Sequence, residues 1–182
     1  TNYTEVFSEK YNFIQWYGNT LVMVFMIIVL KIGIVTLTAY AFARLRFKGR
    51  DILFLVLLSS IMIPPDAVIV PKYVIFKAFG IVDSMWSIIL PSIFDVFFVF
   101  MVRQFFLAIP ETLSEAAIID GCSHFKIYSR IILPLAKPAI VTMILFTFIW
   151  AWNDYMGPYI FITSPEKQML SVGIKMFQVN NA

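Results

Sequence analysis

Long apolar runs constrain this chain more than any other feature of its sequence. The first run, Leu21–Ala43, is interrupted by a single charge at Lys31. Three further runs follow at Ile52–Ile63, Met85–Val102 and Leu133–Trp152. A helix needs roughly 20 mostly apolar residues to cross a membrane. We therefore predict an all-α integral membrane protein, a polytopic helical bundle with about four spans.

The composition favours lipid over water as the solvent of this chain. Hydrophobic residues make up 60% of its 182 residues and charged residues only 14%. A soluble domain has about 25% charged and about 45–50% apolar residues, so a soluble enzyme and a secreted scaffold are both excluded. The chain has one cysteine, Cys122, and one histidine, His124. These do not supply the ligands of a usual zinc site, and we expect no metal site.

Prolines and polar residues divide the chain between the runs. Pro64 and Pro65 end or kink the second span, because a helix does not pass undisturbed through two prolines. The segment Ala67–Phe79 is amphipathic, and we expect a short surface or re-entrant helix there. After Trp152 the sequence is typical of a loop and contains no further span. We expect residues 1–182 to form a single transmembrane domain, and the missing initiator methionine indicates a fragment.

Basic residues predict the orientation of these spans. They are dense in the short connection after the first run, at Arg44, Arg46, Lys48 and Arg50, and recur in the long connection Arg103–Ile132. Lysine and arginine collect on the cytoplasmic side of membrane proteins, so we place both connections there. Aromatic residues near the outer end of the fourth run fit an interfacial belt, although a role in binding a ligand is an alternative. They are Trp150, Trp152, Tyr155 and Tyr159.

The long connection contains a predicted pair of short helices. Pro110 suits a first helical position, and Glu111 is favourable beside it because a helix N-terminus is positive. Gly121 is placed to take the left-handed conformation that ends a helix. Ser123 can cap a second helix that runs through Arg130.

The first of these helices has the character of a docking element. Its small-residue face contains Leu113, Ala116, Ala117 and Asp120. A helix of this length is marginal in water without a packing partner. The alternative is a helix that lies on lipid headgroups, but those favour basic faces and this helix carries Glu111, Glu115 and Asp120. Docking into another protein is therefore the better interpretation.

The same segment resembles the EAA loop of MetI-like permease subunits of binding-protein-dependent ABC importers. The resemblance is carried by Glu115-Ala116-Ala117, by Gly121 and by Ile131-x-Leu133-Pro134. It extends from Asn19 to Phe177, and its flanks are similar to the carbohydrate branch, as in the smaller permease of the maltose system. These flanks are Asn19-Thr20-Leu21, Ala39–Arg44, Arg103–Phe106, Trp152-Asn153-Asp154 and Leu170–Gly173. Permeases of this family have one span before and one after this segment.

The resemblance implies a multi-pass subunit of the bacterial inner membrane that forms half of the translocation path for a sugar or related solute. The implied partners are a second permease subunit in a heterodimer, two ATPase subunits, an extracytoplasmic solute-binding protein and membrane lipid, without nucleic acid. Residues 110–134 would couple to the ATPase. The coupling residues are Glu115, Ala116, Ala117, Asp120, Gly121, Ile131, Leu133 and Pro134.

ATP is expected on the partner subunit, since this chain has no G-x-x-x-x-G-K-[ST] loop that would cradle phosphates and so binds no cofactor itself. An intramembrane enzyme would need a nucleophile with a base. Ser59 and Ser60 have none near them in sequence, so we expect no catalytic residue. A permease for a non-sugar solute and a non-transporting membrane scaffold stay as alternatives.

Four polar residues are candidates for the translocation path. Lys31 and Asp95 lie at matching depths, about 15 Å and 13.5 Å from the outer ends of their spans at 1.5 Å per residue. A charge at mid-bilayer is costly, so the two either pair or find separate partners. Asn153 and Asp154 place polar groups at the outer end of the fourth run, where they line the path or form an interfacial cap.

Overall fold

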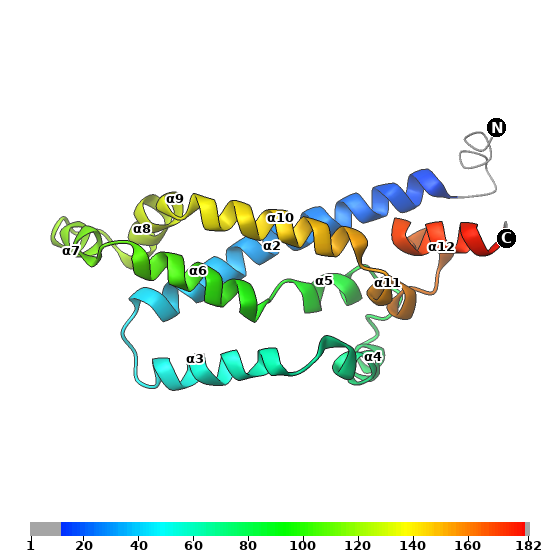
Figure 1. Cartoon of the computed structure of the whole chain (residues 1–182), viewed down its shortest axis with the longest axis horizontal. Coiled ribbons are helices and arrows are strands. Elements are labelled where there is room, and N and C mark those ends of the chain that lie inside the picture. Colours follow the sequence, from blue (N-terminus) through cyan, green and yellow to red (C-terminus); the bar gives the residue numbers. More distant parts are fainter. Residues whose placement is uncertain (1–11, 181–182) are drawn as a thin grey trace. The chain divides into compact units, whose positions relative to one another are not determined.

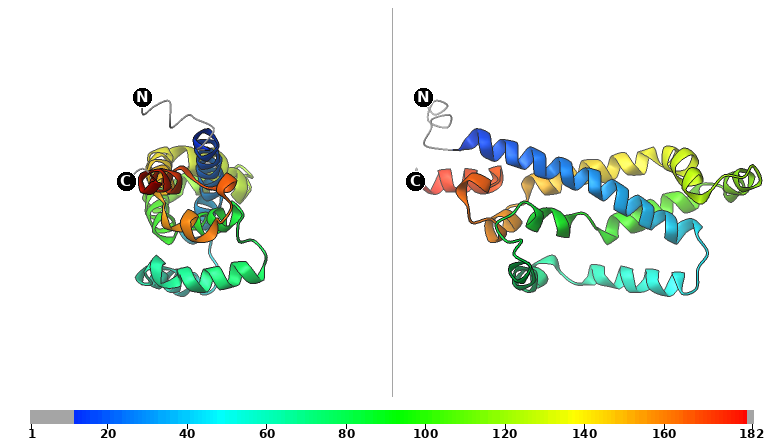
Figure 2. Two further views of the ribbon diagram at one scale, coloured as in Figure 1. Left: turned by 90° about the vertical axis from the view of Figure 1, so that its right-hand side faces the viewer. Right: turned by 180° about the vertical axis from the view of Figure 1, so that it is seen from behind.

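The computed structural model describes residues 12–180, with side chains for residues 12–176, and every regular element in that range is helical. Figure 1 labels the helices and Figure 2 gives two further views. The longer helices are α2 Phe13–Arg44, α3 Arg50–Ser59, α4 Ile69–Ala78, α5 Trp86–Ser92, α6 Val96–Ala108, α7 Glu111–Ile119, α10 Lys137–Asn153, α11 Met156–Phe161 and α12 Leu170–Asn180. The shorter ones are η1 Ser60–Met62, η2 Pro65–Val68, α8 His124–Ile127, the π-helix η3 Tyr128–Ile132, α9 Leu133–Leu135 and η4 Pro165–Lys167.

Two segments of the described chain are long and apolar enough to cross a membrane, namely α2 and Trp86–Ala108. Two interrupted pairs also qualify if each counts as one span: Arg50–Met62 with Pro65–Ala78, and His124–Leu135 with Lys137–Asn153. The predicted all-α membrane fold with about four spans is confirmed. The break at the two prolines and the short helix after it, α4, are also where the sequence placed them.

The third span differs from its prediction as one uninterrupted run. The helix breaks between Ser92 and Val96, and Asp95 takes an extended conformation there as the N-cap of α6. Its carboxylate accepts a hydrogen bond of 3.0 Å from the backbone N–H of Phe97. Helix α6 then continues to Ala108, so the polar connection starts six residues later than its predicted start at Arg103. Hydropathy did not indicate either boundary, because the flanking residues on both sides are apolar.

The fourth span begins at Lys137 rather than at Leu133. The chain bends by 76° between His124–Leu135 and Lys137–Asn153. Pro138 lacks an N–H and is therefore suited to the first turn of the new helix, where no donor is needed. The loop predicted after Trp152 is also wrong in part, because α11 and α12 form there. Both are too short to meet the criterion for a span.

The described chain forms two compact units. Unit 1 comprises the chain up to Val29, Pro65–Ile93 and the chain from Thr147 onward, and unit 2 comprises Leu30–Pro64 and Phe94–Phe146. The expectation of a single transmembrane domain over residues 1–182 stays a prediction.

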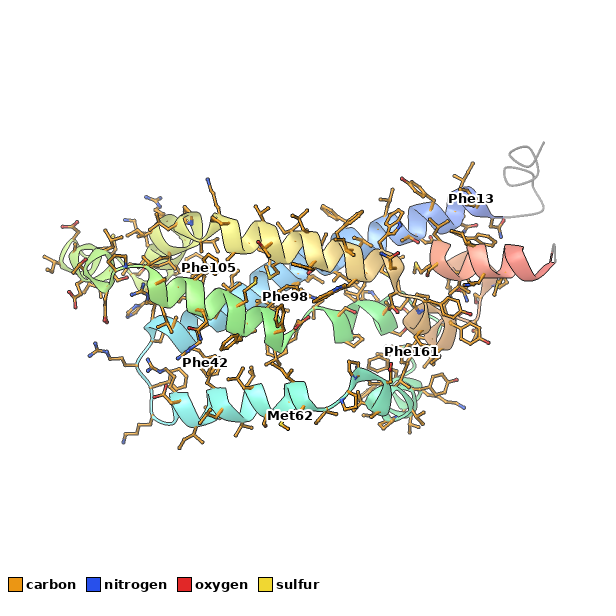
Figure 3. The ribbon with its side chains drawn as sticks, in the orientation of Figure 1. Phe13, Phe42, Met62, Phe98, Phe105 and Phe161 are labelled. Carbon is orange, nitrogen blue, oxygen red and sulfur yellow. The ribbon has the colours of Figure 1, made fainter. Side chains whose placement is uncertain are left out.

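Unit 2 has a core of closely packed apolar side chains from α2, α3, α6, α7 and the helices that lead into α10. Its members include Val35, Tyr40, Phe54, Phe98, Val102, Phe106, Ala117, Ile127, Tyr128, Ile132 and Met143. Phe98, labelled in Figure 3, is fully buried, whereas Phe105 on the same helix is exposed. The Tyr128 hydroxyl lies 2.7 Å from the Thr36 hydroxyl, so the polar tip of this buried side chain has a partner. Exposed apolar side chains cover the outer faces of the helices, as lipid or a partner subunit requires.

In unit 1 the segment 165–168, which precedes α12, is hydrogen-bonded to side chains in the first turns of α2. The Trp16 indole N–H donates to the carbonyl of Pro165 at 3.0 Å, and the Asn19 amide donates to the carbonyls of Glu166 and Gln168 at 2.9 and 3.1 Å. A Cβ added to Gly173 would lie 2.1 Å from the Trp16 ring. Only glycine therefore fits at position 173 against this ring.

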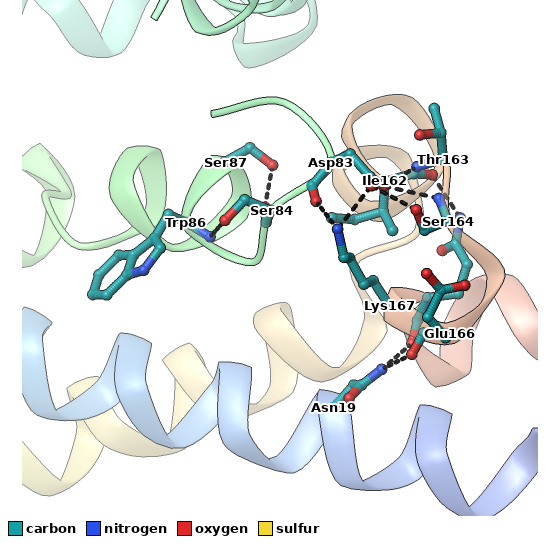
Figure 4. A network of polar contacts seen from close by, with 11 residues as sticks. Asn19, Asp83, Ser84, Trp86, Ser87, Ile162, Thr163, Ser164, Glu166 and Lys167 are labelled. Carbon is teal, nitrogen blue, oxygen red and sulfur yellow. Dashed lines mark hydrogen bonds and ion pairs between the residues drawn. The ribbon is translucent and has the colours of Figure 1, made fainter. Parts of the chain in front are cut away.

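Asp83 is the centre of a second polar network in unit 1, shown in Figure 4. Its carboxylate accepts hydrogen bonds from the backbone N–H groups of Thr163 (2.9 Å) and Ser164 (2.8 Å), and it forms an ion pair with Lys167 (2.9 Å). These bonds, with one from the Ser164 hydroxyl at 2.6 Å, lower the pKa of the Asp83 carboxyl strongly. Asp83 also has a positive φ of 60°. The neighbouring Ser84 hydroxyl accepts a long bond of 3.4 Å from Trp86 N–H.

We predict that Asp83→Asn lowers the free energy of unfolding at pH 7 by about 1–2 kcal/mol, because charged hydrogen bonds are lost at a partly exposed site. A lowered folded-state pKa contributes stability above the unfolded-state pKa of about 3.9, and this is lost as the pH falls through the folded-state pKa. Thermal unfolding of the purified protein at pH 7 measures the first effect, and a series from pH 5 down to pH 2 follows the onset of the second. Glu166→Gln, an exposed acid in the same segment, is the control. Equal losses in the two variants would contradict the prediction.

Candidate functional site

The predicted docking helix is α7, Glu111–Ile119. Pro110 precedes this helix with φ −55° and ψ 133°, rather than occupying its first position as predicted. Its carbonyl accepts a bond from Leu113 N–H at 3.4 Å, which uses one of the free donors of the first turn. Glu111 therefore stands first, near the positive helix end, and pairs with the exposed Arg46 at 3.3 Å.

Gly121 ends this helix in the manner predicted. Its φ is +77°, and its N–H donates to the carbonyl of Ile118 at 2.9 Å while Cys122 N–H donates to Ala117 at 2.8 Å. These two bonds form the Schellman arrangement, in which a residue with positive φ follows the helix. No neighbouring atom lies within 4 Å of a Cβ added here. The backbone conformation alone, and not space, therefore requires glycine.

The two faces of α7 have different surroundings. Ser114 and Ala117 are buried, and Ala117 belongs to the core of unit 2. The predicted shared face of Ala116 and Ala117 is therefore wrong for Ala117, because one helical position turns the side chain by about 100°. All other positions of α7 are exposed, among them Glu115, Ala116 and Ile119, and so are Asp120 and Gly121 after it. Ile119 is 86% exposed, so the outward face is partly apolar.

The rest of the loop is a run of helix with a π-helical turn. Ser123 precedes α8 as predicted, but its side chain makes no capping hydrogen bond. The helix passes through η3 into α9 instead of ending at Arg130. Ile131 and Leu133 are half-buried and Pro134 is exposed. The buried residues of this run, which fasten it to the core of unit 2, are Ile127, Tyr128 and Ile132.

Two arginines join α2 and α6 beside this loop. Arg44, the last residue of α2, donates from Nη2 to the carbonyl of Phe106 at 2.6 Å and to that of Ile109 at 2.5 Å. Arg103 of α6 donates in return from Nε to the carbonyl of Phe42 at 3.2 Å. In the sequence both arginines belong to the basic residues that predict orientation and to the flanks of the family resemblance, and neither pattern indicates these backbone contacts.

A cavity of 540 Å³ lies beside the inner side of α7 in unit 2. Arg44, Ser114, Glu115 and His124 are among its lining residues. The Arg44 Nε and Ser114 Oγ atoms are buried and have no hydrogen-bond partner among the described residues. Both atoms are almost completely enclosed by neighbouring atoms rather than exposed to the cavity.

Lys31 and Asp95 form an ion pair within unit 2, with 3.6 Å between Nζ and Oδ2. Lys31 is only 5% exposed, and its ammonium lies 5.1 Å from the centre of the Phe98 ring. The pairing that matching depth allowed is thus present, and separate satisfaction of the two charges is not. Their place in a translocation path stays a prediction.

Asn153 and Asp154 end α10 in unit 1. The Asn153 amide donates to the carbonyl of Ile149 at 2.7 Å, and its side chain is exposed. Asp154 is half-buried and accepts a bond from Gly157 N–H at 3.2 Å. Burial raises the pKa of this carboxyl, and the backbone hydrogen bonds oppose that shift. Asp154 also lines a cavity of 230 Å³, together with Asp66, Lys72, Ser87, Ser92 and Phe161.

The Ser59 hydroxyl donates a hydrogen bond to the carbonyl of Val56, and the Ser60 hydroxyl donates one to the carbonyl of Leu57, both at 2.7 Å. His124 is exposed and Cys122 is a free thiol. Among residues 12–180 no three histidine, cysteine or acidic side chains are grouped to hold a metal ion.

Comparison with known proteins identifies the class. The family model described as "Binding-protein-dependent transport system inner membrane component" matches residues 34–182. The chain belongs to this family of transport permeases.

Relatives of this chain include permease proteins of three transport systems. The arabinooligosaccharide transport permease AraQ of Bacillus subtilis is 34% identical over 173 residues, which cover 95% of this chain and 62% of the relative. The maltodextrin permease MdxG of the same organism is 32% identical, with 92% and 61% covered. The sn-glycerol-3-phosphate permease UgpE of Salmonella typhimurium is 34% identical, with 86% and 56% covered.

A solved structure has the same fold. A chain of a bacterial ABC transporter involved in the import of the acidic polysaccharide alginate superposes with a TM-score of 0.87 at 25% identity. The match covers 93% of this chain and 60% of that one. The chain thus spans about three fifths of the length of the relatives it matches. The predicted ABC permease fold is confirmed.

The Lys31–Asp95 pair predicts a strong energetic coupling. Asp95→Asn keeps an oxygen for the Phe97 cap but leaves Lys31 buried without its partner, and we expect a loss of about 3 kcal/mol in unfolding free energy. Adding Lys31→Met should restore part of it, so that the double variant is more stable than the sum of the singles by about 1–3 kcal/mol. Unfolding in detergent measures the cycle. Additive losses would show that the two charges do not interact.

Proposed function

We propose that this chain is half of the membrane-spanning part of an ATP-driven importer in a bacterial inner membrane, and that its solute is a sugar or related molecule. The observation that carries the proposal is α7, whose inner face is fixed in the core while Glu115, Ala116 and Asp120 are exposed. A helix anchored on one side and open on the other is suited to receive a partner.

The partner at α7 is an ATPase subunit, which binds the outward face and places a basic residue near Glu115. In this orientation the loop at residues 110–134 and the end of α2 face the cytoplasm, as the basic residues predict. A second permease subunit completes the path, and a solute-binding protein delivers the solute from outside. Support comes from family membership and from the match to a permease chain of a solved importer.

Transport follows from a change in affinity between two states. When the ATPase subunits close on ATP, they bind one arrangement of α7 better than the other, and the helices shift toward that arrangement. The chemistry of ATP hydrolysis belongs to the partner. The role of this chain is to transmit movement and to line the path.

A sugar is favoured as solute for two reasons. Two relatives are named for oligosaccharide substrates, arabinooligosaccharides and maltodextrin. The cavity beside Asp154 also combines carboxylates with serine hydroxyls and an aromatic ring, a set that binds hydroxyl groups and an apolar sugar face.

Substitution of Gly121 tests the proposal. Gly121→Val should reach the membrane at normal levels but reduce ATPase association and solute uptake by roughly tenfold, because a β-branched residue resists positive φ. Gly121→Asn, which tolerates that conformation, is the control and should keep most uptake. Uptake into vesicles with ATP and the loaded binding protein is the measurement. Normal uptake by the valine variant contradicts the coupling role, and absence of ATP-driven uptake by the unaltered assembly contradicts the function itself.

The path role of Asn153 has its own test. A single cysteine at position 153, with Cys122→Ser, should react more slowly with a water-soluble thiol reagent when solute is present or when the ATPase is held closed. The reason is that a path residue loses contact with outside water in those states. Labelling rates that are equal in every state would place Asn153 in an interfacial cap.

A further inference from the structure

The junction between α6 and α7 is short. Helix α6 ends at Ala108 and α7 begins at Glu111, so only Ile109 and Pro110 connect them. Ile109 is extended, with φ −73° and ψ 131°, and Pro110 continues this with φ −55°. No intrahelical hydrogen bond continues from α6 into α7 across such a segment. The direction in which α7 leaves α6 therefore depends on contacts outside the junction backbone.

Arg44 makes such a contact on both sides of the helix end. The carbonyl of Phe106 lies in the last turn of α6, and the carbonyl of Ile109 lies beyond the helix, next to Pro110. One nitrogen of the guanidinium donates to both, at 2.6 and 2.5 Å. The Phe106 carbonyl also accepts a bond of 3.3 Å from Ile109 N–H. The last carbonyls of a helix carry partial negative charge, so a cation is favoured beside them.

A second arginine makes the connection between α2 and α6 reciprocal. Arg103 of α6 donates to the carbonyl of Phe42 in α2, and its guanidinium lies 4.2 Å from the centre of the Phe54 ring. Each helix thus gives an arginine to the backbone of the other. The end of α2, the end of α6 and the start of α7 are thereby joined through side chains whose donors are planar and stiff.

We propose that Arg44 is the positioning residue of the coupling loop: it fixes α7 in direction against α2 and α6, so that a displacement of α7 moves these helices with it. This inference rests on the proposed function. The competing explanation is that Arg44 only sets membrane orientation by its charge. Arg46 is suited to that role, since its guanidinium is exposed and pairs only with exposed Glu111 among the contacts of the described chain. Arg44 is half-buried and is bound to backbone.

Spin labels test the positioning without any transport. The labels replace Leu37 of α2, which is 46% exposed, and Ile119 of α7, which is 86% exposed, in a Cys122→Ser background. The full-length subunit, purified without the ATPase so that the label at position 119 meets no docking partner, should give one narrow distance distribution. Arg44→Met should broaden or shift it, and Arg44→Lys should do so too, because an ammonium does not reproduce the guanidinium's planar donor geometry. Arg46→Met, the matched control two residues away, should leave the distribution unchanged.

The second measurement is the number of solute molecules transported per ATP hydrolysed by the reconstituted assembly. Arg44→Met should keep the ATPase subunit bound and retain ATP hydrolysis within about twofold, while transport per ATP falls by about tenfold, the scale of a lost coupling between sites. Arg46→Met should stay within about twofold on both counts.

The outcomes separate the competing explanations. An unchanged distance distribution together with unchanged transport per ATP in Arg44→Met overturns the proposal. If Arg44→Met is poorly produced, Arg44→Lys carries the test, since it keeps the charge and nearly the volume. A wild-type assembly that shows no ATP-driven uptake refutes the proposed function, but the spin-label result still decides whether Arg44 positions α7.

Discussion

Polar groups in lipid have no water to bind, so each needs a partner within the protein. The carboxylate of Asp95 is the partner of two such groups, an ammonium and a backbone N–H. One oxygen lies 3.6 Å from the buried ammonium of Lys31, and the other accepts the N–H of Phe97 at the start of α6. The charge within the first span and the break within the third are therefore consequences of one another. Lys31 requires an acid at its depth, and that acid is most useful at a helix start with free donors.

The same constraint explains the other end of α6. A helix carries partial positive charge at its N-terminus and partial negative charge at its C-terminus. Asp95 stands at the first and the Arg44 guanidinium at the second, so both ends of this apolar helix meet a side chain of opposite sign. Without these two side chains, α6 would leave free donors and acceptors at both ends in surroundings of low dielectric constant.

Several features could be predicted from the sequence because each has a local or one-dimensional cause. The spans follow from run length and the end of α7 follows from Gly121. The matching depth of Lys31 and Asp95 made their pairing one of two open outcomes, and the structure has the pair. The helix breaks at Asp95 and Ala136 could not be predicted in this way. Hydropathy measures transfer into lipid and does not depend on where the backbone hydrogen bonding of a helix is interrupted. An apolar run therefore has the same hydropathy whether its helix is broken or continuous.

The contacts of Arg44 and Ala117 were missed for a different reason. The carbonyls that Arg44 binds are 62 and 65 residues away in sequence, and charge counting assigns an arginine only to a side of the membrane. The helical period places Ala116 and Ala117 on adjacent positions, but it does not tell which of them meets the chain's own core. That choice depends on packing with α6 and α8, which only the folded chain determines.

The packing of Ala117 explains how so short a helix can act as a lever. Helix α7 has nine residues, too few to be stable alone in water. Ala117 shares its core with Tyr40 of α2, Phe106 of α6 and Ile127 of α8. Close-packed protein interiors have low compressibility and transmit strain, so α7 does not slide freely over this core. A force on its exposed face either separates this core or moves the helices that form it, and the second outcome costs less as long as the core stays closed.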